Sequence, residues 1–145
     1  TVNAQYVKDL SFENPHAPRS LLPGAKPPEV SVTVDVRAQP LGDNVFEVAL
    51  TVRAEANRDG QTAFLAELTY AGVFTLGDVP QDIIRPVLLI EGPRLLFPFA
   101  RAILSDAVRD GGFPPLLINP IDFADLYRRR MAEAGQDGDA PPTRQ

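Results

Sequence analysis

The first half of the chain alternates apolar and polar side chains with a period of two. In residues 30–37 four valines alternate with polar residues, and a second alternation runs through residues 46–55. A third covers residues 61–76. Its two faces carry Phe64, Ala66, Leu68 and Tyr70 on one side and Leu65, Glu67 and Thr69 on the other. This period predicts three strands, each with one face in a core and one in water.

Two turn signals separate these strands. Residues 42–44 read Gly-Asp-Asn and residues 57–60 read Asn-Arg-Asp-Gly. Both favour tight reversals, so neighbouring strands should run antiparallel. A fourth alternation, over residues 6–13, precedes them and predicts another strand. It places Lys8, Leu10 and Phe12 on one face and Val7, Asp9, Ser11 and Glu13 on the other.

A long proline-rich connection joins the first strand to the second. Residues 14–29 hold five prolines, too many for a helix or an inner strand. An irregular segment of this length is uncommon inside a compact domain and is usually functional when it is ordered. We therefore expect this connection to form a binding element.

The second half of the chain changes to helical spacing. Residues 94–110 predict an amphipathic helix that ends at the glycine pair 111–112. Pro98 lies inside this segment, so either the regular helix begins near Phe97 or the helix kinks at the proline. Residues 80–91 also have helical spacing, but an internal proline interrupts them and predicts only a short, irregular helix.

The last predicted helix begins at Asn119-Pro120, a side-chain cap followed by a first-turn proline. Asp122 suits the positive end of this helix, and Gly135 ends it. Strands followed by helices predict an α+β fold of two layers, a four-stranded antiparallel sheet with helices packed on one face. We assign a single domain to residues 1–134 and a flexible tail to residues 135–145.

Composition and charge exclude several classes of function. With 14 basic and 19 acidic side chains, the 145-residue chain has a formal charge of −5, the wrong sign for gripping a phosphate backbone. It has no cysteine, which excludes disulfides and thiolate metal sites and is compatible with the cytoplasm. The first twenty residues hold no signal-peptide core, and charges and prolines break the most apolar stretch, residues 87–104. We expect a soluble protein that binds no nucleic acid and does not insert into a membrane.

Catalytic constellations are also missing from the sequence. The single histidine, His16, lies among prolines in the connection, with no second histidine or cysteine to complete a metal site or to activate a nucleophile. We assign it no role. No glycine-rich phosphate loop precedes a helix. The sequence therefore predicts no cofactor, no metal site and no enzyme.

Carboxylates on the polar strand faces are the remaining candidate chemistry. Asp9 and Glu13 project from one face of their strand, as Leu65 and Glu67 do from theirs. If these two strands are neighbours, an acidic patch surrounds one apolar side chain. The patch is either a solvated sheet face or a docking site for a basic partner. A catalytic carboxylate pair has less support, because nothing apolar on that face would raise one pKa.

Aromatic residues offer a second lead. The chain has eight phenylalanines and three tyrosines. Five of them fall in the helical half: Phe97, Phe99, Phe113, Phe123 and Tyr127. They are either core residues or part of a surface that associates or binds apolar ligands, since a thin domain covered on one side cannot hide them all.

Four fragments of the sequence, in one consistent order, resemble the SecB family of bacterial protein-export chaperones. They are YVKDLSFENPHAP at residues 6–18, TAFLAE at 62–67, LFPFAR at 96–101 and FPPLL at 113–117. The likeness extends from about Gln5 to Tyr127. Each fragment alone is a weak signal, and the four together at plausible spacing are a strong one. The order of elements, four strands and then helices, fits the family independently.

The resemblance implies a tetrameric, ATP-independent cytoplasmic chaperone that holds secretory precursors unfolded and delivers them to the SecA motor. It implies a sheet in which the first strand lies beside the fourth, with residues 14–29 as the crossover loop. The acidic patch then becomes the surface on which the short basic zinc-binding tail of SecA docks. The matching residues are Asp9, Glu13, Leu65 and Glu67. The zinc would belong to the partner.

Two further sets of site residues follow from the same resemblance. Ala66, Leu68 and Tyr70 correspond to positions linked with assembly of the tetramer, a dimer of dimers. Clients are expected in grooves lined by the crossover loop and the helices, where apolar contact gives affinity without a sequence motif. The candidate groove residues are Leu21, Leu22, Phe97, Phe99, Phe123 and Tyr127.

The chain departs from the family pattern at one point. Many members place an aromatic residue, often tryptophan, in the crossover loop, whereas this chain has no tryptophan. An alternative also stays open: a SecB-like chaperone that serves another system, such as a toxin–antitoxin pair, without delivery to SecA.

Overall fold

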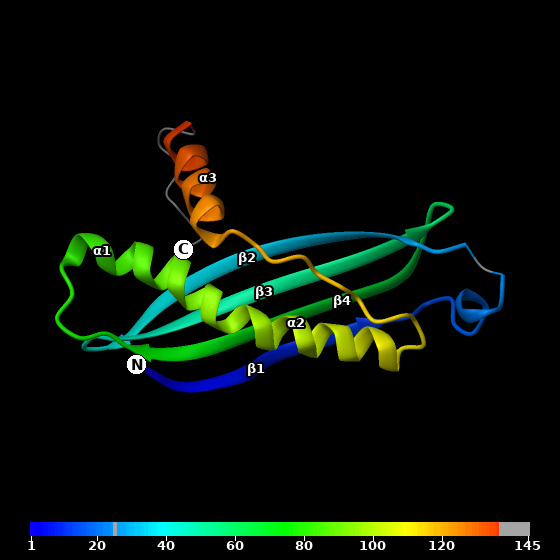
Figure 1. The fold of residues 1–145 in the computed structure, drawn as a ribbon, viewed down its shortest axis with the longest axis horizontal. Helices are drawn as coiled ribbons and strands as arrows, with labels where there is room; N and C mark the ends of the chain where they lie inside the picture. Colours follow the sequence, from blue (N-terminus) through cyan, green and yellow to red (C-terminus); the bar gives the residue numbers. More distant parts are fainter. Residues whose placement is uncertain (25, 137–145) are drawn as a thin grey trace.

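Four long strands form one antiparallel sheet in the computed structural model, which describes residues 1–24 and 26–136 (Figure 1). The strands are β1 Val2–Glu13, β2 Glu29–Gly42, β3 Val45–Arg58 and β4 Gln61–Thr75. Their order across the sheet is β1-β4-β3-β2. The expected α+β fold is confirmed, and so is the crossover that carries the chain from one edge of the sheet to the other.

Tight turns join β2 to β3 and β3 to β4 at both predicted places. Asn44 in the first turn, and Asp59 and Gly60 in the second, have positive φ values of 57°, 51° and 77°. Positive φ at both central residues of a two-residue turn matches the twist of the paired strands. Glycine adopts this conformation without steric cost, which explains Gly60 at the second position.

The faces of β1 differ from the strict alternation predicted for it. Alternation places Lys8 on the same face as Leu10, but the pairing register with β4 shifts between Val7 and Asp9. This β-bulge puts Lys8 on the polar face, where its Nζ lies 2.8 Å from Oε1 of Glu47. The prediction for Lys8 was wrong because a bulge inserts one residue on one strand only and so reverses the alternation.

A continuous helical path follows the sheet. It comprises α1 Gln81–Pro86, a π-helical turn η2 Val87–Glu91, and α2 Gly92–Asp110. The wide turn lies between Pro86 and Pro93, whose missing N–H groups remove bonds that a regular α-helix needs. The predicted irregular helix is present, but it runs directly into the long one. Since α2 passes through Pro98 unbroken, the alternative in which the helix starts near Phe97 was wrong.

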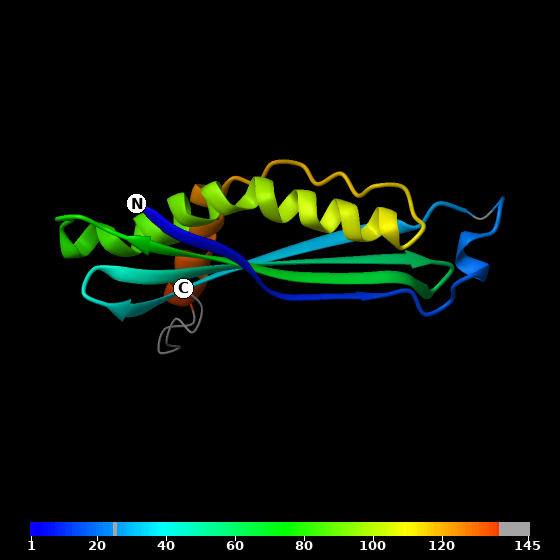
Figure 2. The ribbon, with the colours of Figure 1, turned by 90° about the horizontal axis from the view of Figure 1, so that it is seen from below.

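The long helix covers the middle of the sheet and leaves both edge strands partly open (Figures 1 and 2). A helix is about 10 Å across and strands lie about 4.8 Å apart, so one helix shields about two strands. The inward side chains of β3 and β4 are accordingly buried against those of α2. Fully buried members of this core are Val48, Leu50, Val52, Leu68, Leu96 and Leu104.

The edge strand β2 is only partly covered, and this incomplete cover changes the burial of its valines. Of the four valines predicted to line the core, only Val36 is buried. Val34 is partly buried and packs against the core. Val30 and Val32 are 41% and 37% exposed. The alternation correctly identified a strand, but the predicted burial of Val30 and Val32 was wrong because a hollow remains between them and the elements that pass beside this end of β2.

The last helix, α3 Phe123–Gln136, begins later than its sequence signals predict. Asp122 caps it, because Oδ1 of Asp122 accepts a hydrogen bond from the backbone N–H of Asp125 at 3.0 Å. Asn119 was therefore wrongly predicted as the cap. The helix also continues to Gln136, so Gly135 was wrongly predicted to end it, and the part of the predicted tail from residue 137 onward lies outside the described residues.

Arg130 anchors α3 to β2. Its guanidinium donates to Oδ1 of Asp35 at 2.6 Å and to the carbonyl oxygen of Val34 at 2.8 Å. In Figure 2 this helix crosses the edge of the sheet, so it extends beyond the layer that α1 and α2 form.

A core substitution tests this packing. Leu50 is fully buried, so Leu50→Ala should lower the free energy of unfolding by about 2–5 kcal/mol. Leu41, on the neighbouring strand β2 and 53% exposed, is the matched control. Leu41→Ala should lower the free energy of unfolding by less than about 1 kcal/mol. Urea denaturation at one protein concentration measures both. Equal losses would contradict the assignment of Leu50 to the core.

Candidate functional site

The outer face of the sheet, opposite α2, brings acidic residues from three strands together. Successive rows across β1, β4 and β3 are Glu13 with Leu65 and Glu55, Ser11 with Glu67 and Arg53, and Asp9 with Thr69 and Thr51. The four residues of the predicted acidic patch therefore lie close to one another, and one further carboxylate joins them. We call Asp9, Glu13, Glu55, Leu65 and Glu67 the acidic surface.

Arg53 is a cation within the acidic surface. Its Nη2 lies 3.6 Å from Oε1 of Glu55, and its Nη1 lies 3.9 Å from Oε2 of Glu67. The three side chains are 38–44% exposed, and such pairs contribute only about 0–1 kcal/mol. The carboxylates can therefore change partners at little cost. Sequence alternation turned Arg53 and Glu55 outward, but only the strand register places them beside Leu65.

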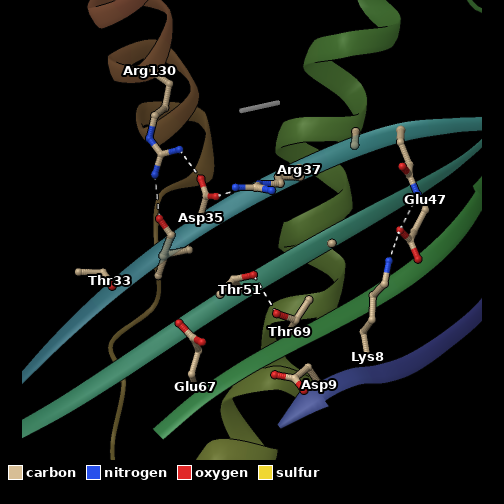
Figure 3. Close-up of a pocket in the computed structure, with 14 residues that line it drawn as sticks. Lys8, Asp9, Thr33, Asp35, Arg37, Glu47, Thr51, Glu67, Thr69 and Arg130 are labelled. Atoms are coloured by element: carbon tan, nitrogen blue, oxygen red, sulfur yellow. Dashed lines mark hydrogen bonds and ion pairs between the residues drawn. The ribbon is translucent and has the colours of Figure 1, made fainter. Parts of the chain in front are cut away.

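A shallow hollow of about 860 Å³ extends from the acidic surface across the sheet to β2 (Figure 3). Asp9 and Glu67 lie toward one side of it and Arg130 toward the other. Between them the hydroxyl groups of Thr51 and Thr69 are hydrogen-bonded at 3.0 Å. Charged and polar side chains dominate the lining, so the hollow suits a polar or charged partner.

Glu47 is a buried carboxylate on this face, only 8% exposed. It accepts hydrogen bonds from Lys8 Nζ at 2.8 Å, from Gln39 Nε2 at 3.1 Å and from the Tyr6 hydroxyl. Burial by itself would raise the pKa of Glu47, but these hydrogen bonds and the charge of Lys8 outweigh burial and lower it. An ionised, fully bonded carboxylate ties β1 to β3 and is not a general acid.

The cluster of Glu47 with Lys8, Gln39 and Tyr6, which we call the Glu47 cluster, also changes the pKa of Tyr6. Burial, the hydrogen bond to Glu47 and the negative charge of Glu47 together raise the pKa of Tyr6 to about 12. The phenol therefore stays neutral and keeps donating its proton to Glu47 over the whole physiological range.

The six predicted client residues separate into two groups. Leu21, Leu22 and Phe99 are 39%, 56% and 50% exposed, and Tyr127 is half-buried. Phe97 and Phe123 are only 5% and 2% exposed, and their ring centroids lie 5.8 Å apart in an edge-to-face contact. This pair belongs to the core between α2 and α3. Helical spacing alone does not distinguish a core aromatic residue from a surface one.

A further apolar surface, which the sequence did not indicate, lies between β2 and residues 113–122. Leu117 is 89% exposed, while the residues on either side of it are buried. Val30 and Val32 line the same hollow, which has a volume of about 700 Å³. We call Val30, Val32, Leu117 and Ile121 with this hollow the β2 groove.

The three predicted assembly residues lie beneath α2. Ala66 and Leu68 are fully buried, and Tyr70 is 8% exposed. The ring of Tyr70 stacks on Phe99 with centroids 6.3 Å apart. Ala66 and Leu68 are therefore not themselves at the surface of this subunit, whereas Tyr70 contacts the exposed Phe99.

The described part of the chain has neither a cluster suited to a metal ion nor a helix suited to a membrane. Within residues 1–24 and 26–136, no three or more His, Cys, Asp or Glu side chains are arranged to hold a metal ion. No helix in this described part is long and apolar enough to cross a bilayer. His16 is half-buried in the crossover loop and lines a small hollow.

Comparison with known proteins gives consistent matches. The chain matches the family model SecB, preprotein translocase subunit SecB, over residues 1–134. A protein-export protein SecB of Rhodospirillum centenum is 54% identical over 95% of this chain and 83% of its own length. Those of Maricaulis maris and Bartonella quintana are 56% and 51% identical, over 91% and 98% of this chain and 77% and 90% of their own.

A solved structure agrees in fold. A SecB-like chaperone of Mycobacterium tuberculosis, in complex with a peptide from an antitoxin, superposes with a TM-score of 0.67. The likeness covers 83% of this chain and 90% of that chain at 15% sequence identity.

An open two-layer fold, with an apolar groove on one side of the sheet and a charged face on the other, is suited to binding other polypeptides. Its class is that of a chaperone in protein export. The chain belongs to the SecB family.

The Glu47 cluster gives a prediction of pH dependence. Because the pKa of Glu47 is lowered from 4.5 on folding, its contribution to stability is full above pH 4.5 and is lost as pH falls through the lowered value. Glu47→Gln should remove this part of the acid dependence, measured as urea midpoints from neutral to acidic pH. Glu29→Gln, at an exposed site, is the control. An unchanged acid profile in Glu47→Gln would contradict the assignment.

Proposed function

We propose that this chain is a cytoplasmic homotetrameric chaperone that holds unfolded secretory precursors without ATP and delivers them to the SecA motor. The observation that carries the proposal is the pair of opposite surfaces on one sheet. The β2 groove and the crossover loop expose apolar side chains, and the outer face carries the acidic surface. Relatives that are 51–56% identical and named protein-export proteins support it.

Client binding is the task of the apolar side. An extended apolar segment laid along Val30, Val32 and Leu117 buries area on both partners, at about 25 cal/mol per Å². Leu21 and Leu22 of the crossover loop offer a second contact. Affinity then depends on the length of contact and needs no sequence motif, which suits a protein that must accept many clients.

SecA docking is the task of the acidic surface. Glu13 and Glu55 flank Leu65, Glu67 is the next outward residue along β4, and Asp9 lies one row further; this arrangement is complementary to a basic tail that carries some apolar surface. The weak pairs of Arg53 with Glu55 and Glu67 do not prevent such docking, because a partner's cations can replace Arg53.

Tetramer assembly is supported by apolar side chains on the helix side that this subunit leaves uncovered. Val7 and Leu10 on β1 and Leu95 and Phe99 on α2 are 43–50% exposed. Apolar surface of this kind is typical of an interface between subunits.

The alternative is a chaperone of the same fold that serves another system without SecA. The observation in its favour is the fold neighbour from Mycobacterium tuberculosis, whose complex holds a peptide from an antitoxin. Both functions use the apolar side. Only delivery to SecA requires the acidic surface, so binding to SecA separates the two.

Charge reversal tests the docking surface. Asp9→Lys and Glu67→Lys should each weaken binding of the isolated basic tail of SecA by about tenfold or more, while capture of an unfolded client stays unchanged. Isothermal titration calorimetry measures the affinity for the tail. Glu91→Lys, on an exposed site of the helical path, is the matched control. Unchanged affinity in both variants would remove SecA docking from this surface.

A polar substitution tests the β2 groove. Leu117→Asp should weaken the capture of reduced, carboxymethylated α-lactalbumin about threefold to tenfold, because it places a charge where apolar contact is expected. Leu41→Asp, at another exposed apolar site on the β2–β3 hairpin, is the control and should have no effect. Light scattering with and without the client reports both assembly and capture. A protein that is monomeric and does not bind the client would contradict the proposal.

A further inference from the structure

The crossover loop was predicted at residues 14–29 and comprises residues 14–28 in the structure, because β2 begins at Glu29. Hydrogen bonds, more than apolar packing, hold it in place. Among its described residues only Ser20 is buried. Beneath it lies a hollow of about 290 Å³. The hollow is lined by His16, Arg19, Ser20, Arg58, Gln61, Thr62 and Ala63. A loop that stands over an open hollow needs polar anchors to keep one conformation.

The principal anchor is Arg58, the last residue of β3. Its Nη1 donates to the carbonyl oxygen of Ser20 at 3.0 Å, and its Nε donates to the carbonyl oxygen of Lys26. One planar guanidinium thus joins two points of the loop that are six residues apart in sequence. Arg58 is itself fixed, because it pairs with Gln61 across the β3–β4 hairpin.

A second anchor fixes the start of the loop to the end of α2. Nδ2 of Asn14 donates to the carbonyl oxygen of Gly111 at 2.9 Å, and Oδ1 of Asn14 accepts from the Ser20 hydroxyl at 3.2 Å. Leu21 then rests on Gly112, where a Cβ would lie only 2.8 Å from Cδ1 of Leu21. Both anchors therefore converge on the residue that precedes Leu21.

We propose that Arg58 is a positioning residue for client binding. By holding the carbonyl groups of Ser20 and Lys26, it keeps Leu21 and Leu22 presented beside the start of the segment that forms the β2 groove. The role rests on the proposed client-holding function. Arg58 acts through the loop and does not itself contact the client.

Neighbouring groups do not replace Arg58. Lys26 and Asp59 form an ion pair at 3.8 Å, but both side chains are 74% exposed, so the pair contributes little. A lysine at position 58 keeps the positive charge but lacks the fork that reaches two carbonyl groups at once. Arg58→Lys should therefore behave like Arg58→Ala, which separates geometry from charge.

Hydrogen exchange tests the anchoring. In Arg58→Ala and Arg58→Lys the backbone amides of residues 20–22 should exchange about tenfold faster than in the wild type, with the exchange of β3 and β4 unchanged. Arg19→Ala removes an exposed arginine from the same loop and is the matched control. Unchanged exchange at residues 20–22 would overturn the proposal.

A double-mutant cycle tests the link to clients. Arg58→Ala should raise the Kd for reduced, carboxymethylated α-lactalbumin about threefold to tenfold. In a protein in which Leu21 and Leu22 are already alanine, Arg58→Ala should cause no further rise in the Kd. Additive losses, or a wild-type Kd in Arg58→Ala, would overturn the positioning role alone. A wild-type protein that fails to bind this client would instead overturn the proposed function, and with it the role of Arg58 in client binding.

Discussion

The width of one helix is the constraint on which the rest of this structure depends. A four-stranded sheet is covered on one face by a single long helical path, and a helix shields about two strands. The two central strands, β3 and β4, therefore supply the core. The inward apolar residues of β1 and of the first part of β2 are covered less completely, so the fold leaves Val7, Leu10, Val30 and Val32 exposed, whereas Val36, beside η2 and α3, is buried.

That uncovered area divides into regions with different neighbours. On the β1 side the exposed residues lie with α2, next to Phe99, and form a surface suited to another subunit. On the β2 side they face the segment of residues 113–122 and form a hollow. The outer face of the sheet has no helix at all and is polar.

The sequence predicted much of this arrangement, and its failures have identifiable physical causes. Alternation located four strands, and the four predicted residues of the acidic patch came together because β1 pairs with β4. Lys8 changed face because a bulge altered the register locally. Phe97 and Phe123 were expected in the client groove but lie in the core, since helical spacing identifies an apolar stripe without saying what covers it.

Local chemistry was enough to determine the order and type of the main elements: period-two alternation, the turn residues and the glycines that end α2 act over a few residues and can be read directly. Only the tertiary structure decided which strands are neighbours, and so placed Glu55 and Arg53 beside Leu65. It alone also placed Arg58 under two carbonyl groups of the crossover loop. Such contacts join residues 10 to 38 positions apart, and their geometry depends on strand order and register, which no local pattern encodes.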